Sequence, residues 1–377
     1  MTTPNIDPAR QETAKTYARI KRRMLLVDLL VGGIYLLIWL LSGASAGLRD
    51  VLLRLTGQQG VLVLLFAAVF GGIYYLINLP LAYYNEFILP HRFELSNQTL
   101  KGWIKDQVLS ALVAGTLGLV VIEVIYLVLR AFPHTWWLWA AGFMLLFNVL
   151  LANLAPVMIA PLFYKFVPLS DEHAELAERL VKLSKKAGAR VRGVFKMDMS
   201  RRTKAANAAL MGIGSTRRIV LGDTLIQEFT PDEIETVLAH ELGHHVHRDI
   251  VWIILFSSLT TLAGFYLAGQ ALNWGVLWLG ASGPADAAAM PLLALVVGLF
   301  GLITMPLENS FSRWRERLAD QYALEMTGKP GAFASAFARL ANQNLAEADP
   351  EAWVEFLLYN HPSLGKRIQM AQGYQPK

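Results

Sequence analysis

Two histidines and a glutamate stand close together in the segment His240-Glu241-Leu-Gly-His244. On a helix, His240 and His244 project from one face because they lie four residues apart. This spacing suits two coordination positions of one zinc ion. Glu241 lies about 100° further around the helix, where it can act as a base toward a zinc-activated water without being a ligand. The pattern predicts zinc-dependent hydrolysis, with Glu241 as the catalytic base.

The residues before this motif predict the helix that positions it. Thr230 is a suitable N-cap, and Pro231 suits the first helical position. Asp232 and Glu233 favour the positive end of the helix dipole, and Glu233 stands three residues after Thr230, as a capping box requires. We therefore expect a helix that starts at Pro231 and runs on into the apolar segment from residue 250.

A third ligand is available further along the chain. The charged segment 309–320 is helical in composition, and Glu316 and Asp320 share one of its faces. Zinc proteases with two His ligands and one Glu take the Glu from a second helix and leave the fourth position to water. We expect Glu316 to be the third ligand and Asp320 to accept a hydrogen bond from a ligand histidine. The alternative is a solvated helix in which both carboxylates form only surface ion pairs.

The composition indicates a membrane protein. Of the 377 residues, 54% are hydrophobic and only 17% are charged, against about 25% charged in soluble proteins. The absence of cysteine excludes disulfides and thiolate metal sites. The net charge of +5 is better explained by basic membrane flanks than by nucleic-acid binding. Runs long enough to cross a lipid bilayer lie at about 24–43, 61–84, 107–130, 136–160, 250–272 and 289–308.

Charged residues within and between these runs bear on how the chain lies in the membrane. Asp28 and Glu123 lie in or near apolar runs, and they either face a hydrated interior or sit near span ends. Basic residues gather before the first span, in the 85–106 loop, in 161–249 and after 308. The positive-inside rule then places both termini and the His-Glu-x-x-His helix in the cytoplasm. We expect an integral protein of the inner or plasma membrane.

The spans divide the chain into four parts: 1–160 with four spans, a soluble α/β portion 161–249 with the His-Glu-x-x-His helix, 250–308 with two spans, and a helical part 309–377 that completes the zinc site. Within the soluble portion, Ser170 is expected to cap a helix that ends near Ala187 and Gly188. Val194–Met197 and Arg218–Leu221 are expected strands. The run 205–214 suits a strand or a hairpin.

With these motifs in order, the chain resembles the type I CAAX prenyl proteases, which are integral-membrane zinc metalloproteases of the gluzincin type. The resemblance covers residues 85 to 370. It is carried by Leu95–Thr99, Pro161–Pro168, Asn207-Ala208, Arg218–Leu225, His240–His244, Ser312–Asp320, Asn360–Ser363 and Arg367. It implies a mainly α polytopic membrane protein with a small α/β gluzincin-like zinc protease domain.

The resemblance also implies roles for single residues. His240, His244 and Glu316 would ligate one zinc ion per chain, and Glu241 would be the general base. Asn207 and Ala208 would lie on an edge strand to which the substrate backbone adds. His361 and Arg367 would face the scissile carbonyl, with His361 as oxyanion stabiliser. Without the resemblance, His361 would be interpreted as an exposed turn histidine.

The chain departs from the family pattern at several points. We count six spans where the eukaryotic members have seven around a large hydrated chamber. Ala205 stands where the family often has histidine, and His245 and His247 follow the motif as expected surface groups. These departures suggest a prokaryotic member and put prenylated substrates and the chamber size in doubt.

Two other functions stay open. One is a membrane protease for quality control of damaged membrane proteins, similar to the HtpX group. The other is a non-catalytic membrane scaffold with a relic zinc site. For the protein as a membrane protease, the expected partners are a peptide or protein substrate and the lipid bilayer, with no nucleic acid. The sequence specifies neither the natural substrate nor the oligomeric state.

Overall fold

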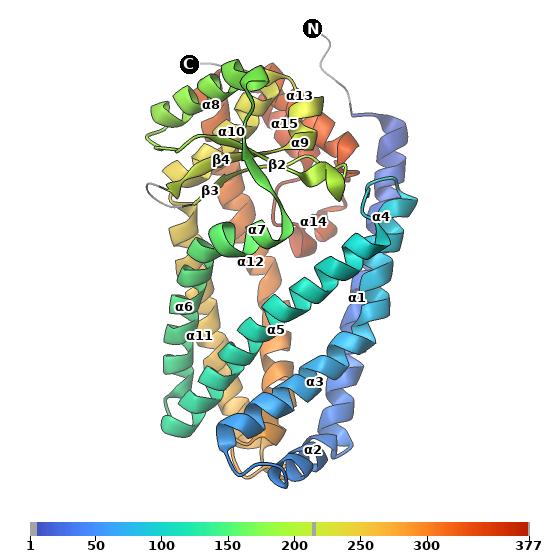
Figure 1. Cartoon of the computed structure of the whole chain (residues 1–377), viewed down its shortest axis with the longest axis vertical. Helices are drawn as coiled ribbons and strands as arrows, with labels where there is room; N and C mark the ends of the chain where they lie inside the picture. The colour runs from blue at the N-terminus through green and yellow to red at the C-terminus, as the bar shows by residue number, and fades with distance from the viewer. Residues whose placement is uncertain (1–5, 213–215, 376–377) are drawn as a thin grey trace.

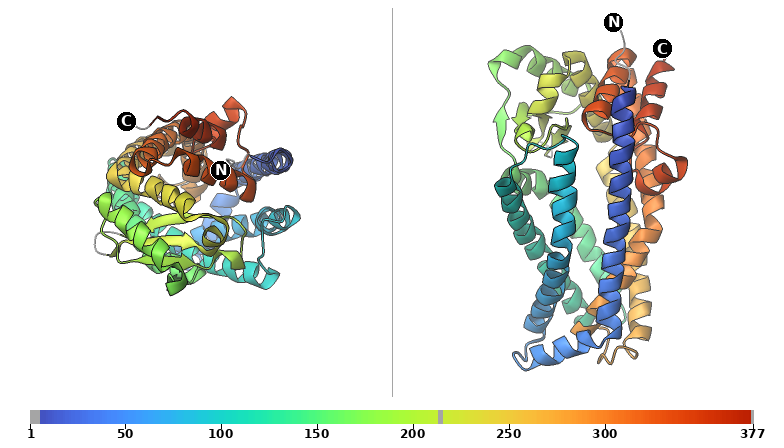
Figure 2. Two further views of the ribbon diagram at one scale, coloured as in Figure 1. Left: turned by 90° about the horizontal axis from the view of Figure 1, so that it is seen from above. Right: turned by 90° about the vertical axis from the view of Figure 1, so that its right-hand side faces the viewer.

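The computed structural model describes residues 6–212 and 216–375. These residues form a long bundle of helices with a smaller α/β head at one end (Figure 1). Both ends of the described chain lie at the head end, as the side view of Figure 2 also shows. The helices are α1 (Pro8–Leu41), α2 (Ala44–Leu53), α3 (Gln59–Ala82), α4 (Leu89–Arg92), α5 (Leu100–Ala131), α6 (Trp136–Leu154), α7 (Ala160–Phe163), α8 (Ala174–Lys186), α9 (Asp223–Glu228), α10 (Pro231–Val246), α11 (Asp249–Gly275), α12 (Met290–Thr327), α13 (Pro330–Gln343), α14 (Ala352–Leu358) and α15 (Leu364–Gln372).

Six helical stretches are long and apolar enough to cross a bilayer, at the six predicted places. They are Pro8–Leu41, Gln59–Arg92, Leu100–Ala131, Trp136–Phe163, Asp249–Gly275 and Ala287–Thr327. Several exceed the predicted span because their polar turns continue into the head. Their outward faces carry exposed apolar side chains, which suits contact with lipid. The chain is therefore a polytopic integral membrane protein.

Polar groups within the bundle are few. Glu123 was expected either to face a hydrated interior or to lie near a span end. It pairs with Arg130 near the end of α5, with 3.1 Å between Glu123 Oε1 and Arg130 Nη2. This supports the position near a span end for Glu123. Asp28 is half-buried in α1, and its surroundings stay open.

The head contains a four-stranded sheet in the order β1-β2-β4-β3. Its strands are β1 (Phe166–Pro168), β2 (Val194–Met197), β3 (Ala208–Met211) and β4 (Arg218–Gly222). β2 and β4 run parallel, and the two outer strands pair antiparallel with them. The two expected strands are present, and the run from 205 forms β3 at one edge of the sheet. Residues 213 and 214 of that run lie outside the described residues.

Helices from distant parts of the chain bury the sheet in one apolar core. α8, α9, α10, the end of α12, α13 and α15 all contribute side chains to it. Ser170 does not cap α8 with its side chain, because a 3₁₀ turn at Asp171–His173 precedes the helix, which starts at Ala174. The helix ends before Gly188, whose φ of +73° suits the expected stop.

Two helices near the motif differ from expectation. α10 does not run straight into the fifth span, because Arg248 adopts a left-handed conformation with φ of +55° and breaks the helix before Asp249. In contrast, α12 is one helix of 38 residues. Its Pro306 is accommodated, so the sixth span and the segment carrying Glu316 and Asp320 are continuous. Glu316, the expected third ligand, thus lies on the same continuous helix as the sixth span.

Candidate metal centre

The helix α10 begins as the sequence predicts. The Thr230 hydroxyl accepts a hydrogen bond from the Glu233 amide at 3.3 Å, and the Thr230 amide donates to the Glu233 carboxylate at 2.8 Å. This capping box satisfies amides that the first turn leaves without partners. Ile234, Leu238 and Leu242 are buried in the core of the head. The anchored apolar face fixes the direction in which His240 and His244 project.

His240, His244 and Glu316 come together at the crossing of α10 and α12. Their donor atoms all lie within 4.8 Å of one another. The two histidine Nε2 atoms are 3.1 Å apart. The Glu316 carboxylate lies 3.3 Å from His240 Nε2 and 3.4 Å from His244 Nε2. Two imidazole nitrogens and one carboxylate therefore converge on one point from two helices.

A glycine permits this crossing. A Cβ on Gly243 would lie 2.8 Å from Ala319 Cα and 3.1 Å from the Ala319 carbonyl oxygen. Such distances are shorter than van der Waals contact with backbone atoms that cannot turn aside. Gly243 thus lets α10 approach α12 closely enough for Glu316 to reach the histidine pair.

The donor set fits a divalent metal ion. Glu316 Oε2 is buried and makes no hydrogen bond within the described part of the chain, and such a group normally has a partner. Burial and the charge of Arg367 lower the pKa of His240, but the neighbouring carboxylates of Asp320 and Glu316 outweigh them and raise it to about 9. The site therefore favours positive charge at this point, and its nitrogen and oxygen donors are those of a metalloprotease.

Both histidines have a carboxylate at Nδ1, and each of these carboxylates accepts a hydrogen bond from an arginine. His240 Nδ1 lies 2.8 Å from Asp320 Oδ1, and Arg367 Nε donates to Asp320 Oδ2 at 2.9 Å. His244 Nδ1 lies 2.7 Å from Asp249 Oδ2, and Arg315 Nε donates to Asp249 Oδ1 at 2.7 Å. We call these the Asp320 relay and the Asp249 relay. A carboxylate on Nδ1 fixes the tautomer that leaves Nε2 free to bind metal.

Of these four residues, the sequence predicted only Asp320 as a hydrogen-bond partner of a ligand histidine, without its contact with Arg367. Asp249 and Arg315 were missed, although both are buried with 2% and 7% of their side chains exposed. Asp249 stands at the start of an apolar span, where it suggests no more than a favourable helix N-terminus. Its position five residues after His244 was the available signal, because a break in the helix can fold such a residue back onto the motif.

Glu241 lies beside the donors without being one of them. Its side chain is half-buried, and burial raises its pKa, although the neighbouring histidines oppose the shift. A raised pKa brings a carboxylate closer to the range in which a general base works at neutral pH.

His361 is close to the centre although it stands 45 residues after Glu316 on the last loop before α15. Its Nε2 lies 3.2 Å from Glu316 Oε1, and its Nδ1 lies 2.7 Å from Asn360 Oδ1. Its side chain is 51% exposed, so it borders the site from the open side. Burial lowers its pKa and the Glu316 carboxylate opposes the shift.

Arg367 borders the cavity beside His361, and its expected contact with substrate stays a prediction. It is buried, its guanidinium binds Asp320, and it stacks on Phe337 with 3.9 Å between Cζ and the ring centroid. This placement favours a role behind His240. Beside His361, a cavity of about 480 Å³ is bordered by Phe337, Leu340, Asn344, Leu358, Tyr359, Leu364 and Arg367, among others.

The expected substrate strand lies at the sheet edge. Ala208 opens β3, and Asn207 precedes it with an exposed side chain. The backbone of Ala206 is held by Asn344, whose side-chain oxygen accepts from the Ala206 amide at 3.0 Å. β3 pairs only with β4 in the described sheet, and α10 packs against it. His245 and His247 stay outside the donor cluster; His245 lies 3.3 Å from Arg217.

Comparisons with known proteins agree with this geometry. A family model described as "Peptidase family M48" matches residues 170–375, and one described as "CAAX prenyl protease N-terminal, five membrane helices" matches residues 2–165. "Uncharacterized metalloprotease YhfN" of Bacillus subtilis is 29% identical over 97% of this chain and 86% of its own length. "CAAX prenyl protease 1 homolog" of Arabidopsis thaliana is 30% identical over 80% of this chain and 71% of its own. The crystal structure of S. mikatae Ste24p aligns with a TM-score of 0.87 at 25% identity, covering 99% of this chain and 92% of that one.

Proposed function

The chain belongs to peptidase family M48 and is an integral-membrane metalloendopeptidase similar to the type I CAAX prenyl proteases; we propose that its metal is a single zinc ion held by His240, His244 and Glu316. The resemblance inferred from the motifs is thus confirmed, and a non-catalytic scaffold is excluded. A prokaryotic origin stays a prediction, supported by the B. subtilis relative. The four-part division of the chain also stays a prediction.

The convergence of three donor atoms within 4.8 Å carries this proposal. Two imidazoles and one carboxylate with room for a fourth ligand are a common catalytic zinc set, whereas magnesium and calcium prefer oxygen ligands. A bound zinc ion would polarise the scissile carbonyl and lower the pKa of water.

Side chains of the chain would transfer the proton, stabilise the oxyanion and orient the histidine. Glu241 would take a proton from the attacking water and deliver it to the leaving amine. His361 would donate a hydrogen bond to the developing oxyanion from the open side of the site. Asp320 would keep His240 in the binding tautomer, and Arg367 would hold Asp320 in place.

We further propose that the substrate is a peptide in extended form, added along Asn207 and Ala208 at the free edge of β3. The edge position of β3 and its contact with α10 support this. Main-chain hydrogen bonds give such binding little dependence on sequence, so side-chain selection falls to pockets. The cavity beside His361 is one such pocket.

The two remaining candidate functions differ in their natural substrate. Relatives are named CAAX prenyl proteases, so a prenylated peptide is one candidate and a damaged membrane protein is the other. Cleavage rates of one peptide with and without a farnesyl group distinguish them. Rates that are equal, together with casein cleavage, would favour quality control.

Metal analysis tests the centre. Purified protein should contain one zinc per chain, and Glu316→Ala should lose most of it, because two histidines alone bind zinc weakly. Glu325→Ala removes an exposed carboxylate from the same helix and should keep the metal. Full zinc and full activity in Glu316→Ala would refute the assignment.

The cytoplasmic orientation of the head rests on the basic flanks and stays a proposal. Because the chain has no cysteine, single cysteines give no background. Ser170→Cys lies exposed on the head and Ser42→Cys lies exposed at the opposite end of α1. An impermeant thiol reagent should label only Ser42→Cys in intact cells. The reverse labelling would overturn the orientation.

A further inference from the structure

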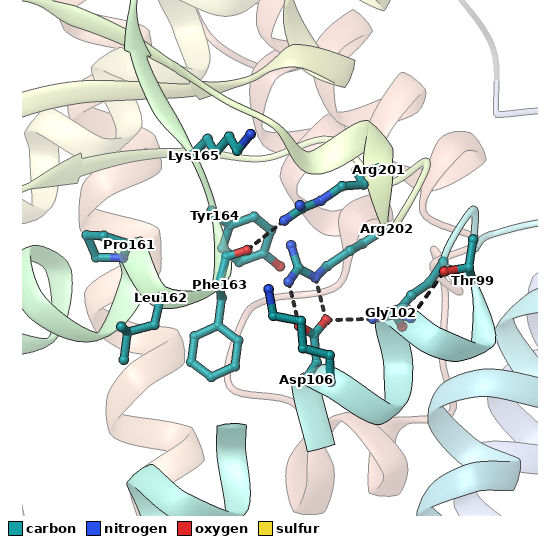
Figure 3. A pocket seen from close by; sticks show the side chains of 12 residues that line it. Thr99, Gly102, Asp106, Pro161, Leu162, Phe163, Tyr164, Lys165, Arg201 and Arg202 are labelled. Atoms are coloured by element: carbon teal, nitrogen blue, oxygen red, sulfur yellow. Dashed lines mark hydrogen bonds and ion pairs between the residues drawn. The ribbon is translucent and has the colours of Figure 1, made fainter. Parts of the chain in front are cut away.

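A second cavity lies away from the metal centre, where the bundle meets the head. It has a volume of about 360 Å³ and lies between the start of α5, the stretch from α7 into β1, and the turn at Arg201 and Arg202 (Figure 3). Here α5 enters the bundle and the stretch around α7 leaves it. The cavity is therefore at the boundary between bilayer and water.

The lining is strongly basic. It contains Lys105, Lys165, Arg201 and Arg202 against the single carboxylate of Asp106. Both lysines are exposed. No hydrogen bond or ion pair of either lysine side chain is found within the described residues. Neither ammonium group is neutralised by a carboxylate of the described residues, so the cavity carries positive charge that an anion can bind.

Arg202 is fixed by its neighbours and keeps a donor to spare. Its Nε and Nη2 donate to the two oxygens of Asp106, each at 2.6 Å, and its guanidinium stacks on Tyr164 at 4.8 Å from the ring centroid. Its Nη1 is buried and has no hydrogen-bond partner within the described residues. Gln98 also donates to Asp106, at 2.6 Å. The carboxylate is thereby occupied, and the free donor of an oriented guanidinium suits a phosphate oxygen.

The bilayer side of the cavity is apolar. Leu162 lines it with 50% of its surface exposed, and Ile104 and Leu100 on the adjoining turn of α5 are 49% and 46% exposed. Exposed apolar side chains beneath a cluster of cations match a molecule with an anionic head and hydrocarbon tails.

We propose that this cavity binds the phosphate headgroup of one anionic phospholipid from the leaflet on the head side. The apolar border and the position at the bilayer boundary favour a lipid over free phosphate, which needs no hydrocarbon surface. The site is separate from peptide hydrolysis. A bound lipid would contact both α5 and the segment that leads to β3. These two segments already meet at one hydrogen bond, in which the Arg202 carbonyl accepts from the Asn97 amide at 3.0 Å.

Native mass spectrometry of the detergent-solubilised full chain tests the site, since only bound lipid survives the removal of micelles. The chain is titrated separately with dioleoyl phosphatidylglycerol, dioleoyl phosphatidylcholine and glycerol 3-phosphate. Wild type should retain one phosphatidylglycerol and prefer it to phosphatidylcholine by about 10-fold, given the attraction of each basic residue for anionic lipid. Glycerol 3-phosphate, which lacks acyl chains, should compete only at far higher concentration.

Two double variants remove equal charge from the same face. Lys105→Gln/Lys165→Gln should weaken phosphatidylglycerol binding about 10-fold or more. Arg92→Gln/Lys101→Gln changes two exposed cations outside the lining and should change it less than about 2-fold. Lys105→Arg/Lys165→Arg keeps the charge and should keep the binding, which separates a lost site from a misfolded protein.

Three results would overturn the proposal. The first is equal retention of the two lipids. The second is equal weakening by the two double variants, which would indicate a general surface charge. The third is competition by glycerol 3-phosphate at lipid-like concentration, which would indicate a site for a soluble anion.

Discussion

The head and the membrane bundle are stabilised by different kinds of contact. In the head and at the helix ends that enter it, charged side chains are buried and paired, as in the Asp320 and Asp249 relays. In the bundle, most buried side chains are aromatic or aliphatic, for example Trp39 against Phe66 and Trp136 against Phe265, and a largely buried ion pair between Arg49 and Asp286 lies at the end away from the head. Lipid tails are as apolar as these side chains, so shape complementarity contributes most to the association of the helices.

The difference indicates how a substitution acts in each region. A buried carboxylate in the head orients another group, so its removal changes chemistry before it changes the fold. A residue in the bundle contributes volume, so its replacement changes packing. The following predictions test this distinction, from the largest expected effect to the smallest.

Glu241→Gln should reduce peptide hydrolysis by about 10²–10⁴-fold, because the amide cannot take a proton from water. The metal content and melting temperature should stay at wild-type values, since Glu241 is not among the three donors. Rate assays on the metal-loaded protein, together with metal analysis, measure both. Loss of the metal with the activity would indicate a structural role instead.

Replacing the aspartate by asparagine should affect the metal affinity equally in both relays, although only the Asp320 relay lies wholly within the head. Asp249→Asn and Asp320→Asn should each weaken metal affinity about 10–100-fold, because the amide no longer fixes the histidine tautomer. Competition with a chelator gives the affinities. The buried Arg315 and Arg367 would each lose a charged partner, so a loss of stability of about 3 kcal/mol is expected in each variant. An unchanged affinity in Asp249→Asn would remove the second relay from the site.

Gly243 in the head and Gly264 in the bundle give a direct comparison of close contacts. An added methyl group meets the Ala319 backbone at 2.8 Å in the first case and the Phe300 ring at 2.9 Å in the second. A ring can turn and a helix backbone cannot, so Gly243→Ala should cost about 1–3 kcal/mol and part of the metal affinity. Gly264→Ala should cost less, and Gly301→Ala, which meets nothing within 4 Å, should be neutral. Thermal melting and metal retention measure the order, and the reverse order would contradict it.

Glu233 should make the head sensitive to acid. Burial alone would raise its pKa, but hydrogen bonds from Ser335, the Thr230 amide and Arg339 hold the pKa below its ordinary value. The carboxylate therefore stabilises the fold fully above about pH 4.3, its unfolded pKa, and this contribution is lost as the pH falls through the lower folded pKa.

Glu233→Gln should lower stability by about 1 kcal/mol at pH 7 and flatten this acid limb. Melting curves at several pH values measure both effects. A variant with the same acid limb as wild type would show that another group causes it.

Contiguous sequence was enough to predict the features that depend on neighbours along one helix. The capping box at Thr230 and the shared face of His240 and His244 follow from spacing, because a turn repeats every 3.6 residues. The six spans follow from the length of their apolar runs. β2 and β4 followed from short apolar runs between turn signals. His361 came from the family resemblance alone, since an isolated histidine before a proline carries no local signal.

Only the tertiary structure decided which distant faces meet. It placed Asp249 behind His244 and Arg367 behind Asp320, and it made α12 one helix from the bilayer to the site. It also put β3 at the sheet edge, which the family resemblance had implied but which strand patterns alone cannot specify. These outcomes depend on long-range packing, such as the crossing permitted by Gly243 against Ala319. A local pattern encodes the direction of a side chain on its own helix, whereas its partner is set by the free energy of the whole core.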